Sequence, residues 1–120
     1  MNWLSTGALF AALAIMTGAF GAHGLENRLD AHHLAIWHKA VDYHALHGLA
    51  LVLIGILQRQ GTVVAPAGWL LLGGILLFSG SLYLLAITNI RWLGMITPLG
   101  GLSFIAGWIV LAFLTRRKTS

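Results

Sequence analysis

The chain contains no cysteine and very few charged residues. Without cysteine it forms no disulfide, no thiol nucleophile and no Cys-based metal site. Charged residues make up 8% of its 120 residues, against about 25% in soluble domains, whereas hydrophobic residues make up 58%. A soluble core cannot hide so much apolar surface in so short a chain. We therefore expect lipid to be its main solvent, and one domain over residues 1–120.

The positive net charge does not indicate a nucleic-acid-binding protein. Three of the seven basic residues are Arg116, Arg117 and Lys118 near the C-terminus, and no basic face with interleaved aromatic residues occurs. A basic tail on a membrane protein is better explained as a topology signal or as a contact with anionic lipids. The expected partner is therefore the lipid bilayer, and nucleic acid is not expected.

Four apolar segments are each long enough to cross a bilayer core as a helix. They cover about residues 3–22, 40–57, 67–87 and 93–114. The first lacks the basic region that typically precedes a cleaved signal sequence. Short connections between the segments predict an all-α integral membrane protein, packed as an antiparallel four-helix bundle. The polar residues 23–39 predict either a plain loop or a short interfacial helix between the first two spans.

This topology places both termini on one side of the membrane. Lys and Arg on that side are Arg59, Arg116, Arg117 and Lys118, and those on the other side are Arg28, Lys39 and Arg91. An excess of basic residues marks the cytoplasmic side. Four against three favours both termini in the cytoplasm.

Polar residues gather in the half of the bundle that carries the first and third connections. Tyr43 and His47 lie four residues apart in the second span, and His44 and His47 lie three apart, so each pair shares a helix face. Polar groups are costly in lipid, so we expect them to face the bundle interior and to pair with one another. The predicted site is a buried polar cluster of His23, Tyr43, His47 and Tyr83, with His44, Asp42 and Thr97 as secondary candidates.

Four functions are compatible with such a cluster to different degrees. Histidine pairs at helical spacing can bind a metal or haem, but these form no specific ligand motif. Titratable His and Tyr side chains can move protons or line a solute path, but the polar zone covers only half of the bilayer. The absence of a GxSxG pattern and the scarcity of carboxylates argue against an enzyme. We favour a structural or accessory role without a cofactor, in a homo-oligomer or a larger membrane complex.

Five motifs follow one another along the chain: GAFGAHGL at residues 18–25, W-x2-A-x2-Y-x3-H at 37–47, LFSGSLYLLA at 77–86, ITPLGG at 96–101 and AGW at 106–108. Together they resemble the YgdD/YwdK-like family of small bacterial inner-membrane proteins, which carry a domain of unknown function and have distant mitochondrial relatives. The resemblance implies a four-helix membrane protein, but no activity, substrate or cofactor.

The same resemblance separates the histidines into two groups. The family pattern includes His23, Tyr43 and His47, whereas glutamine is usual at the position of His44. The remaining histidines, His32, His33 and His38, belong to no motif. A histidine-rich metal site would therefore be peculiar to this chain.

Overall fold

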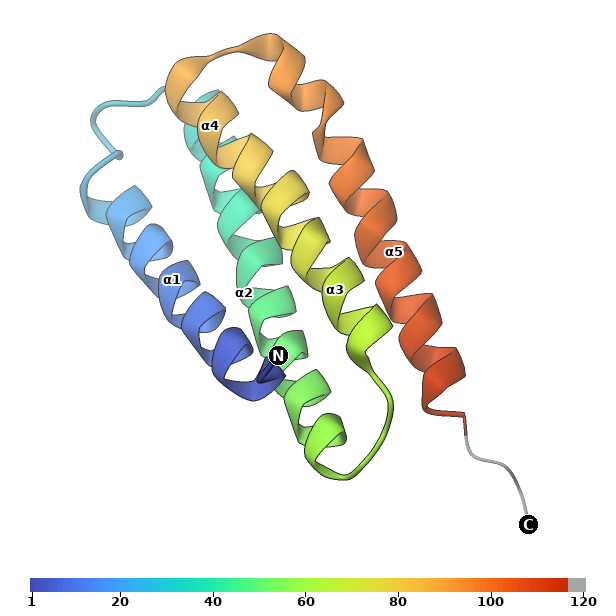
Figure 1. Cartoon of the computed structure of the whole chain (residues 1–120). Coiled ribbons are helices and arrows are strands. Elements are labelled where there is room, and N and C mark those ends of the chain that lie inside the picture. Colours follow the sequence, from blue (N-terminus) through green and yellow to red (C-terminus); the bar gives the residue numbers. More distant parts are fainter. Residues whose placement is uncertain (117–120) are drawn as a thin grey trace.

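Antiparallel helices make up the computed structural model, which describes residues 1–116 (Figure 1). In chain order they are α1 (Trp3–His23), α2 (Ala31–Arg59), α3 (Ala65–Gly74), the π-helical turn η1 (Ile75–Ser79), α4 (Gly80–Thr88), the 3-10 helix η2 (Arg91–Met95) and α5 (Thr97–Leu114). Because α3, η1 and α4 are continuous and only Ile96 separates η2 from α5, these elements form four segments long and apolar enough to cross a membrane. The prediction of an all-α membrane protein with four spans is confirmed.

The four observed segments enclose the four spans that hydropathy predicts. Their bounds are 3–23, 31–59, 65–88 and 91–114. The largest difference is in α2, whose 29 residues begin at Ala31. The stretch 31–39 is therefore neither a loop nor a separate interfacial helix, and only residues 24–30 form the connection. At 1.5 Å per residue, a helix of this length is about 44 Å long and extends well beyond a bilayer core of about 30 Å.

Local side-chain chemistry explains where the helices begin and end. Asp30 caps α2, because its Oδ1 accepts a hydrogen bond of 2.8 Å from the backbone N–H of His33. Asn89 ends α4 in the left-handed conformation at φ 55°, which asparagine adopts more readily than most residues. Pro98 lies in the first turn of α5, where a missing N–H removes no intrahelical hydrogen bond. Helix α5 therefore begins at Thr97 and is not kinked at Pro98.

Small residues bring α1 and α2 into close contact. A Cβ atom on Gly7 would collide with the backbone of Val52, and one on Gly48 would lie 2.9 Å from the backbone nitrogen of Ala11. Such close backbone approach is the usual basis of helix association in lipid. The small residues Gly7, Ala14 and Gly21 of α1 therefore pack within the chain. Helix α2 and the 65–88 segment are buried to a greater extent than α1 and α5, which lie at the flanks (Figure 1).

The π-helical turn η1 connects the 65–88 segment to both of its neighbours. The backbone N–H of Gly80 bonds to the carbonyl of Ile75, five residues earlier, which marks the inserted residue. Ser79 is fully buried and its hydroxyl donates to the Ala40 carbonyl of α2 at 2.8 Å. On the other side, Gly100 of α5 lies against the backbone of Phe78. The turn thus lies where α2, the 65–88 segment and α5 meet.

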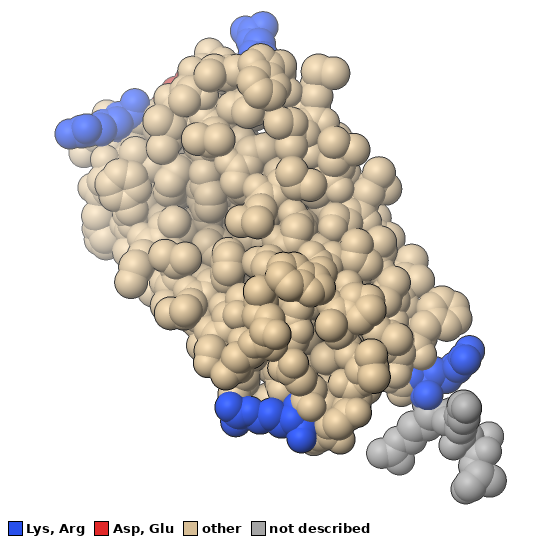
Figure 2. Space-filling view, viewed as in Figure 1, with Lys and Arg blue, Asp and Glu red and all other residues tan. Residues whose placement is uncertain are grey.

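Basic side chains lie at the two ends of the face shown in Figure 2, whereas the exposed Asp42 lies about three turns into α2. Figure 2 shows Lys and Arg at both ends of the visible face, with a band between them that bears no charged side chain there. Two of the basic residues used for the topology prediction, Arg117 and Lys118, lie outside the described residues. This distribution is the one expected of a protein whose middle is surrounded by lipid.

Candidate functional site

The predicted polar cluster is divided between two sides of α2. His44 faces α1 and α4, where it meets Tyr83. His47, one turn further along, faces α5, where it meets Trp108. Both histidine side chains are buried, with exposed fractions of 5% and 2%. His44 and His47, although both on α2, therefore belong to two separate hydrogen-bonded groups.

The first group joins three helical segments through a chain of hydrogen bonds. The Tyr83 hydroxyl lies 2.8 Å from Nδ1 of His44 and 2.9 Å from the Thr17 hydroxyl. Thr17 lies 3.0 Å from the Ala14 carbonyl oxygen within its own helix. The Trp37 indole N–H donates to the Thr17 carbonyl oxygen at 2.8 Å, and its ring packs 4.6 Å from that of Tyr83. These bonds thus join α1, α2 and α4 near the end of the molecule that carries the connections 24–30 and 89–90.

One arrangement of protons satisfies every bond of this chain. Because Thr17 donates to the Ala14 carbonyl oxygen, Tyr83 donates to Thr17 and His44 donates from Nδ1, which leaves a lone pair on Nε2. The reverse order would break the bond between Thr17 and Ala14 and leave their two oxygens facing each other with no hydrogen between them. The buried Nε2 atom of His44 has no hydrogen-bond partner among residues 1–116. An unpartnered buried polar atom carries a desolvation cost of about 1–3 kcal/mol.

The second group fixes His47 in a single tautomer. Its Nδ1 atom lies 2.8 Å from the Tyr43 carbonyl oxygen, which can only accept a hydrogen bond. Its Nε2 atom lies 3.0 Å from the Trp108 indole N–H, which can only donate. His47 therefore carries its hydrogen on Nδ1. Its ring also stacks on Phe104 of α5, with ring centroids 3.6 Å apart and planes 11° apart.

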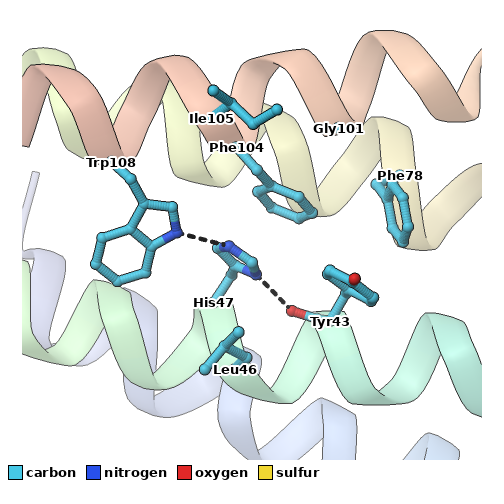
Figure 3. Close-up of a pocket in the computed structure, with 8 residues that line it drawn as sticks. All are labelled: Tyr43, Leu46, His47, Phe78, Gly101, Phe104, Ile105 and Trp108. Carbon is cyan, nitrogen blue, oxygen red and sulfur yellow. Dashed lines mark hydrogen bonds between the residues drawn. The ribbon is translucent and has the colours of Figure 1, made fainter.

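His47 also lines a largely apolar groove between α2 and α5 (Figure 3). The groove has a volume of about 380 Å³ and is lined by Tyr43, Leu46, His47, Phe78, Gly101, Phe104, Ile105 and Trp108. Figure 3 shows Trp108 and Tyr43 on opposite sides of His47, joined to it by the two hydrogen bonds. Tyr43 is 41% exposed, so its ring forms part of the groove wall and its backbone carbonyl supplies the contact with His47.

The other predicted site residues lie apart from both groups. His23 is the exposed last residue of α1, and Asp42 is exposed on α2. Thr97 is partly buried and its hydroxyl lies 2.6 Å from that of Ser81, a bond that joins α4 to α5. The structure therefore brings together His44 with Tyr83, and His47 with Tyr43, but it does not bring all four primary residues into one cluster.

Two residues that reasoning from sequence left outside the site contribute directly to it. Trp108 supplies the only donor to His47 Nε2 among the described residues. Ser79 ties η1 to α2 through the Ala40 carbonyl. The available signal was their position, since an indole or hydroxyl group deep in an apolar span needs a partner.

A third histidine forms a polar link at the surface. Nδ1 of His33 lies 2.7 Å from Asp30 Oδ1, and Nε2 lies 2.9 Å from the Asn89 side-chain oxygen, so the start of α2 meets the end of α4. The hydrogen bond from the His33 backbone N–H holds the pKa of the Asp30 carboxyl below its ordinary value, and the His33 side chain lowers that pKa further. This link lies outside both buried groups.

Hydrogen bonding and aromatic packing between helices are the chemistry that this arrangement offers. Among residues 1–116, no three His, Asp or Glu side chains lie together in a way that could hold a metal ion. His44 and His47 face different neighbours and so do not converge on one point. The polar side chains instead meet one another in pairs across the helix interfaces.

Comparisons with known proteins agree with this picture. Residues 17–101 match the family described as "Protein of unknown function (DUF423)". The chain is 54% identical over 110 residues to a UPF0382 membrane protein of Staphylococcus saprophyticus, covering 91% of this chain and 92% of the relative. It is 52% identical over 110 residues to a UPF0382 membrane protein of Staphylococcus aureus, covering 91% and 90% of the two chains.

A third relative bears on the resemblance drawn from the sequence motifs. The chain is 50% identical over 108 residues to the UPF0382 membrane protein YwdK of Bacillus subtilis, covering 88% of each chain. The resemblance to YwdK-like proteins is thereby confirmed. No solved structure matches the chain significantly.

Proposed function

The chain belongs to the DUF423 family, whose relatives above are membrane proteins, and from that premise we propose that it is a structural or accessory component of the bacterial inner membrane. In this role it acts within a homo-oligomer or a larger membrane complex. The proposed role includes no catalytic step and no cofactor. One observation carries it: the polar side chains inside the bundle, apart from Nε2 of His44, form hydrogen bonds, most of which join one helix to another.

Side-chain hydrogen bonds join the neighbouring helical segments throughout the bundle. Those that cross between segments include Trp37 to the Thr17 carbonyl, Tyr83 to Thr17, His44 to Tyr83, Ser79 to the Ala40 carbonyl, Trp108 to His47, Ser103 to the Leu70 carbonyl, Ser81 to Thr97 and the Trp3 backbone N–H to Gln58. Interhelical hydrogen bonds in membrane proteins contribute about 0.6 kcal/mol each on average. Their combined effect supports a rigid unit with a fixed helix register.

Location in the inner membrane is part of the proposal. Helical spans support it, because spanning proteins of the bacterial outer membrane are β-barrels. For orientation, we propose that both termini lie in the cytoplasm, in line with the bias of basic residues toward the terminus-bearing end. A C-terminal reporter fusion that is active only in the cytoplasm tests this orientation. Activity of a periplasmic or extracellular reporter at the same position would contradict it.

Proton movement is the second candidate, and the unpartnered Nε2 atom of His44 is the observation that favours it. A proton could pass from His44 through Tyr83 to Thr17. The chain then ends at the Ala14 carbonyl oxygen, which cannot pass a proton on. We therefore expect the same proton flux in proteoliposomes containing the wild type, His44→Phe or no protein. A wild-type flux that His44→Phe abolishes would replace the structural role with a transport role.

Assembly is tested by photo-crosslinking in the membrane. A crosslinking amino acid is placed at Ile15 of α1 or Ile109 of α5, which are 74% and 52% exposed, and at Leu51 as a buried control. An accessory role predicts one dominant crosslinked product of defined mass from an exposed position and none from Leu51. A lone monomer from every exposed position, and in native mass spectrometry, would contradict it.

The absence of a cofactor is a separate part of the proposal. Elemental analysis and an absorption spectrum of the protein purified in mild detergent test it. We expect no stoichiometric metal and no haem absorption band. A metal bound at one equivalent per chain, or a Soret band, would overturn this part of the proposal.

A further inference from the structure

A second groove lies between the first turns of α2 and the α4–η2 turn, at the end of the molecule that carries the connections 24–30 and 89–90. Its volume is about 350 Å³, and it is lined by His32, His33, Ile36, Leu85, Asn89 and Arg91. None of the structural hydrogen bonds inside the bundle uses these residues. The groove is thus separate from both buried histidine groups.

Polar and apolar residues lie at different depths in this groove. Ile36 lies one helical turn further into α2 than His32, and Leu85 lies one turn further into α4 than Asn89. One turn is about 5.4 Å along the helix axis. The outer rim is therefore polar and basic, and the inner part is apolar, in the order of a phospholipid headgroup and its acyl chains.

Hydrogen-bond donors dominate the rim. Arg91 carries a guanidinium group, His32 an exposed imidazole, and Asn89 an amide whose oxygen already accepts from His33 and whose NH₂ group supplies donors. No Asp or Glu is among the described residues that line the groove. Asp30, which lies nearby, is engaged with the backbone and ring of His33. This donor set is complementary to a phosphate group.

The position of the rim relative to the membrane follows from its neighbour Trp92. This side chain is 60% exposed and follows Arg91 directly at the start of η2. Exposed tryptophans at the ends of membrane spans lie at the level of the lipid headgroups. Arg91 is therefore at the depth where lipid phosphates are found.

We propose that this groove binds the phosphate group of an anionic phospholipid, with Arg91 and His32 at the phosphate and with Ile36 and Leu85 against the first methylene groups of the lipid. The recognised chemistry is phosphate, and the lipid is its source. The site gives the chain a lipid preference in addition to its proposed structural role.

Native mass spectrometry tests the site on the full chain, released from nanodiscs of equal phosphatidylglycerol and phosphatidylcholine. The wild type is expected to retain one phosphatidylglycerol in preference to phosphatidylcholine. Removing the charge with Arg91→Gln is expected to reduce that preference about tenfold, the effect of losing one charge-assisted contact. Arg28→Gln is the matched control, because Arg28 is an exposed arginine at the same end that does not line the groove.

A second variant, His32→Gln, checks that a weaker lipid preference does not come from misfolding. A second ligand, inorganic phosphate, distinguishes free phosphate from the phosphate of a lipid headgroup. His32→Gln removes a rim donor and is expected to weaken the preference less than Arg91→Gln does, with unchanged circular dichroism. Inorganic phosphate is titrated into the protein in phosphatidylcholine nanodiscs, and the readout is the change in tryptophan fluorescence that is absent from Trp92→Phe. Equal lipid preference in Arg91→Gln and Arg28→Gln would overturn the site. Tight inorganic phosphate binding without a lipid preference would overturn the lipid assignment.

Discussion

His44 and His47 are buried on the same helix, three residues apart, and yet their environments differ. Both nitrogens of His47 are hydrogen-bonded, so one tautomer is fixed, and the ring stacks on Phe104. His44 is bonded through Nδ1 alone, from which it donates to Tyr83, and Nε2 is unpartnered among the described residues. A buried polar group stabilises a fold only to the extent that its hydrogen bonds are complete. We therefore expect His47 to contribute more to stability than His44 does.

Truncation of His47 is expected to have the largest effect. His47→Ala removes the stacked ring, leaves a void beside Phe104 and deprives the Trp108 N–H of its acceptor. We expect the free energy of unfolding in micelles to fall by roughly 2–4 kcal/mol. Leu49→Ala, at a 57% exposed position on the same helix, is the control and is expected to change stability little. Equal losses in both variants would mean that His47 only fills space.

Trp108→Phe is expected to leave Nε2 of His47 without a hydrogen-bond partner, as Nε2 of His44 already is in the wild type. The substitution keeps an aromatic ring in α5 but removes the donor to His47 Nε2, which then has no partner. We expect a loss of roughly 1 kcal/mol in the unfolding free energy, in the range of single interhelical hydrogen bonds. The ¹⁵N chemical shifts of the His47 ring report whether the fixed tautomer is lost. Unchanged shifts and stability would show that the indole hydrogen bond does not form in lipid.

His44→Phe is expected to have a smaller effect than either change at the His47 site. It removes a polar atom that is buried without a partner, and Tyr83 keeps its bond to Thr17. Replacing an incompletely bonded group by an apolar one of similar shape changes stability by about 0.5 kcal/mol or less, in either direction. Thermal unfolding of His44→Phe beside wild type measures this change. A loss as large as that of His47→Ala would reverse the comparison.

A third histidine, His33, forms a hydrogen-bonded pair with Asp30 at the surface, and this pair titrates. Because hydrogen bonds from His33 lower the pKa of Asp30 in the folded chain, the ionised carboxylate stabilises the fold above the unfolded-state pKa of about 3.9. That stabilisation is lost as the pH falls through the lower folded-state pKa. Asp30 stays ionised between pH 7 and 5. In that range His33, whose pKa is raised by its hydrogen bonds to Asn89 and Asp30, loses its stabilising charge as the pH rises. Below pH 4 we expect stability to decline slightly as Asp30 is protonated. Asp30→Asn keeps a helix cap but cannot titrate, so a parallel decline in that variant would exclude Asp30 as the cause.

Most of the fold follows from the sequence, because span length and hydropathy are local properties. The beginning of α2 does not follow from hydropathy, since polar residues can continue a helix beyond the bilayer once Asp30 caps it. The π-helical turn at Ile75–Ser79 has no proline or charge to signal it and depends on packing against α2 and α5. Local patterns therefore predict the spans better than their ends or irregularities.

The site is less predictable, because spacing places residues on one helix face but does not say which helix that face meets. His44 and His47 were expected as neighbours in one cluster, but the rotation of α2 turns them toward different helices. Trp108 lies 61 positions from His47 in the sequence, and no local pattern links the two. Pairing across helices depends on helix rotation, which only the tertiary packing determines.

The central claim is that buried polar side chains stabilise helix pairing, and a double-mutant cycle at His47 and Trp108 tests it most directly. His47→Phe, Trp108→Phe and the double variant are compared with wild type by their free energies of unfolding in one lipid–detergent mixture. The hydrogen bond between α2 and α5 predicts a favourable coupling of about 0.6–1.7 kcal/mol. Strictly additive effects, with no coupling between the two positions, would contradict the claim.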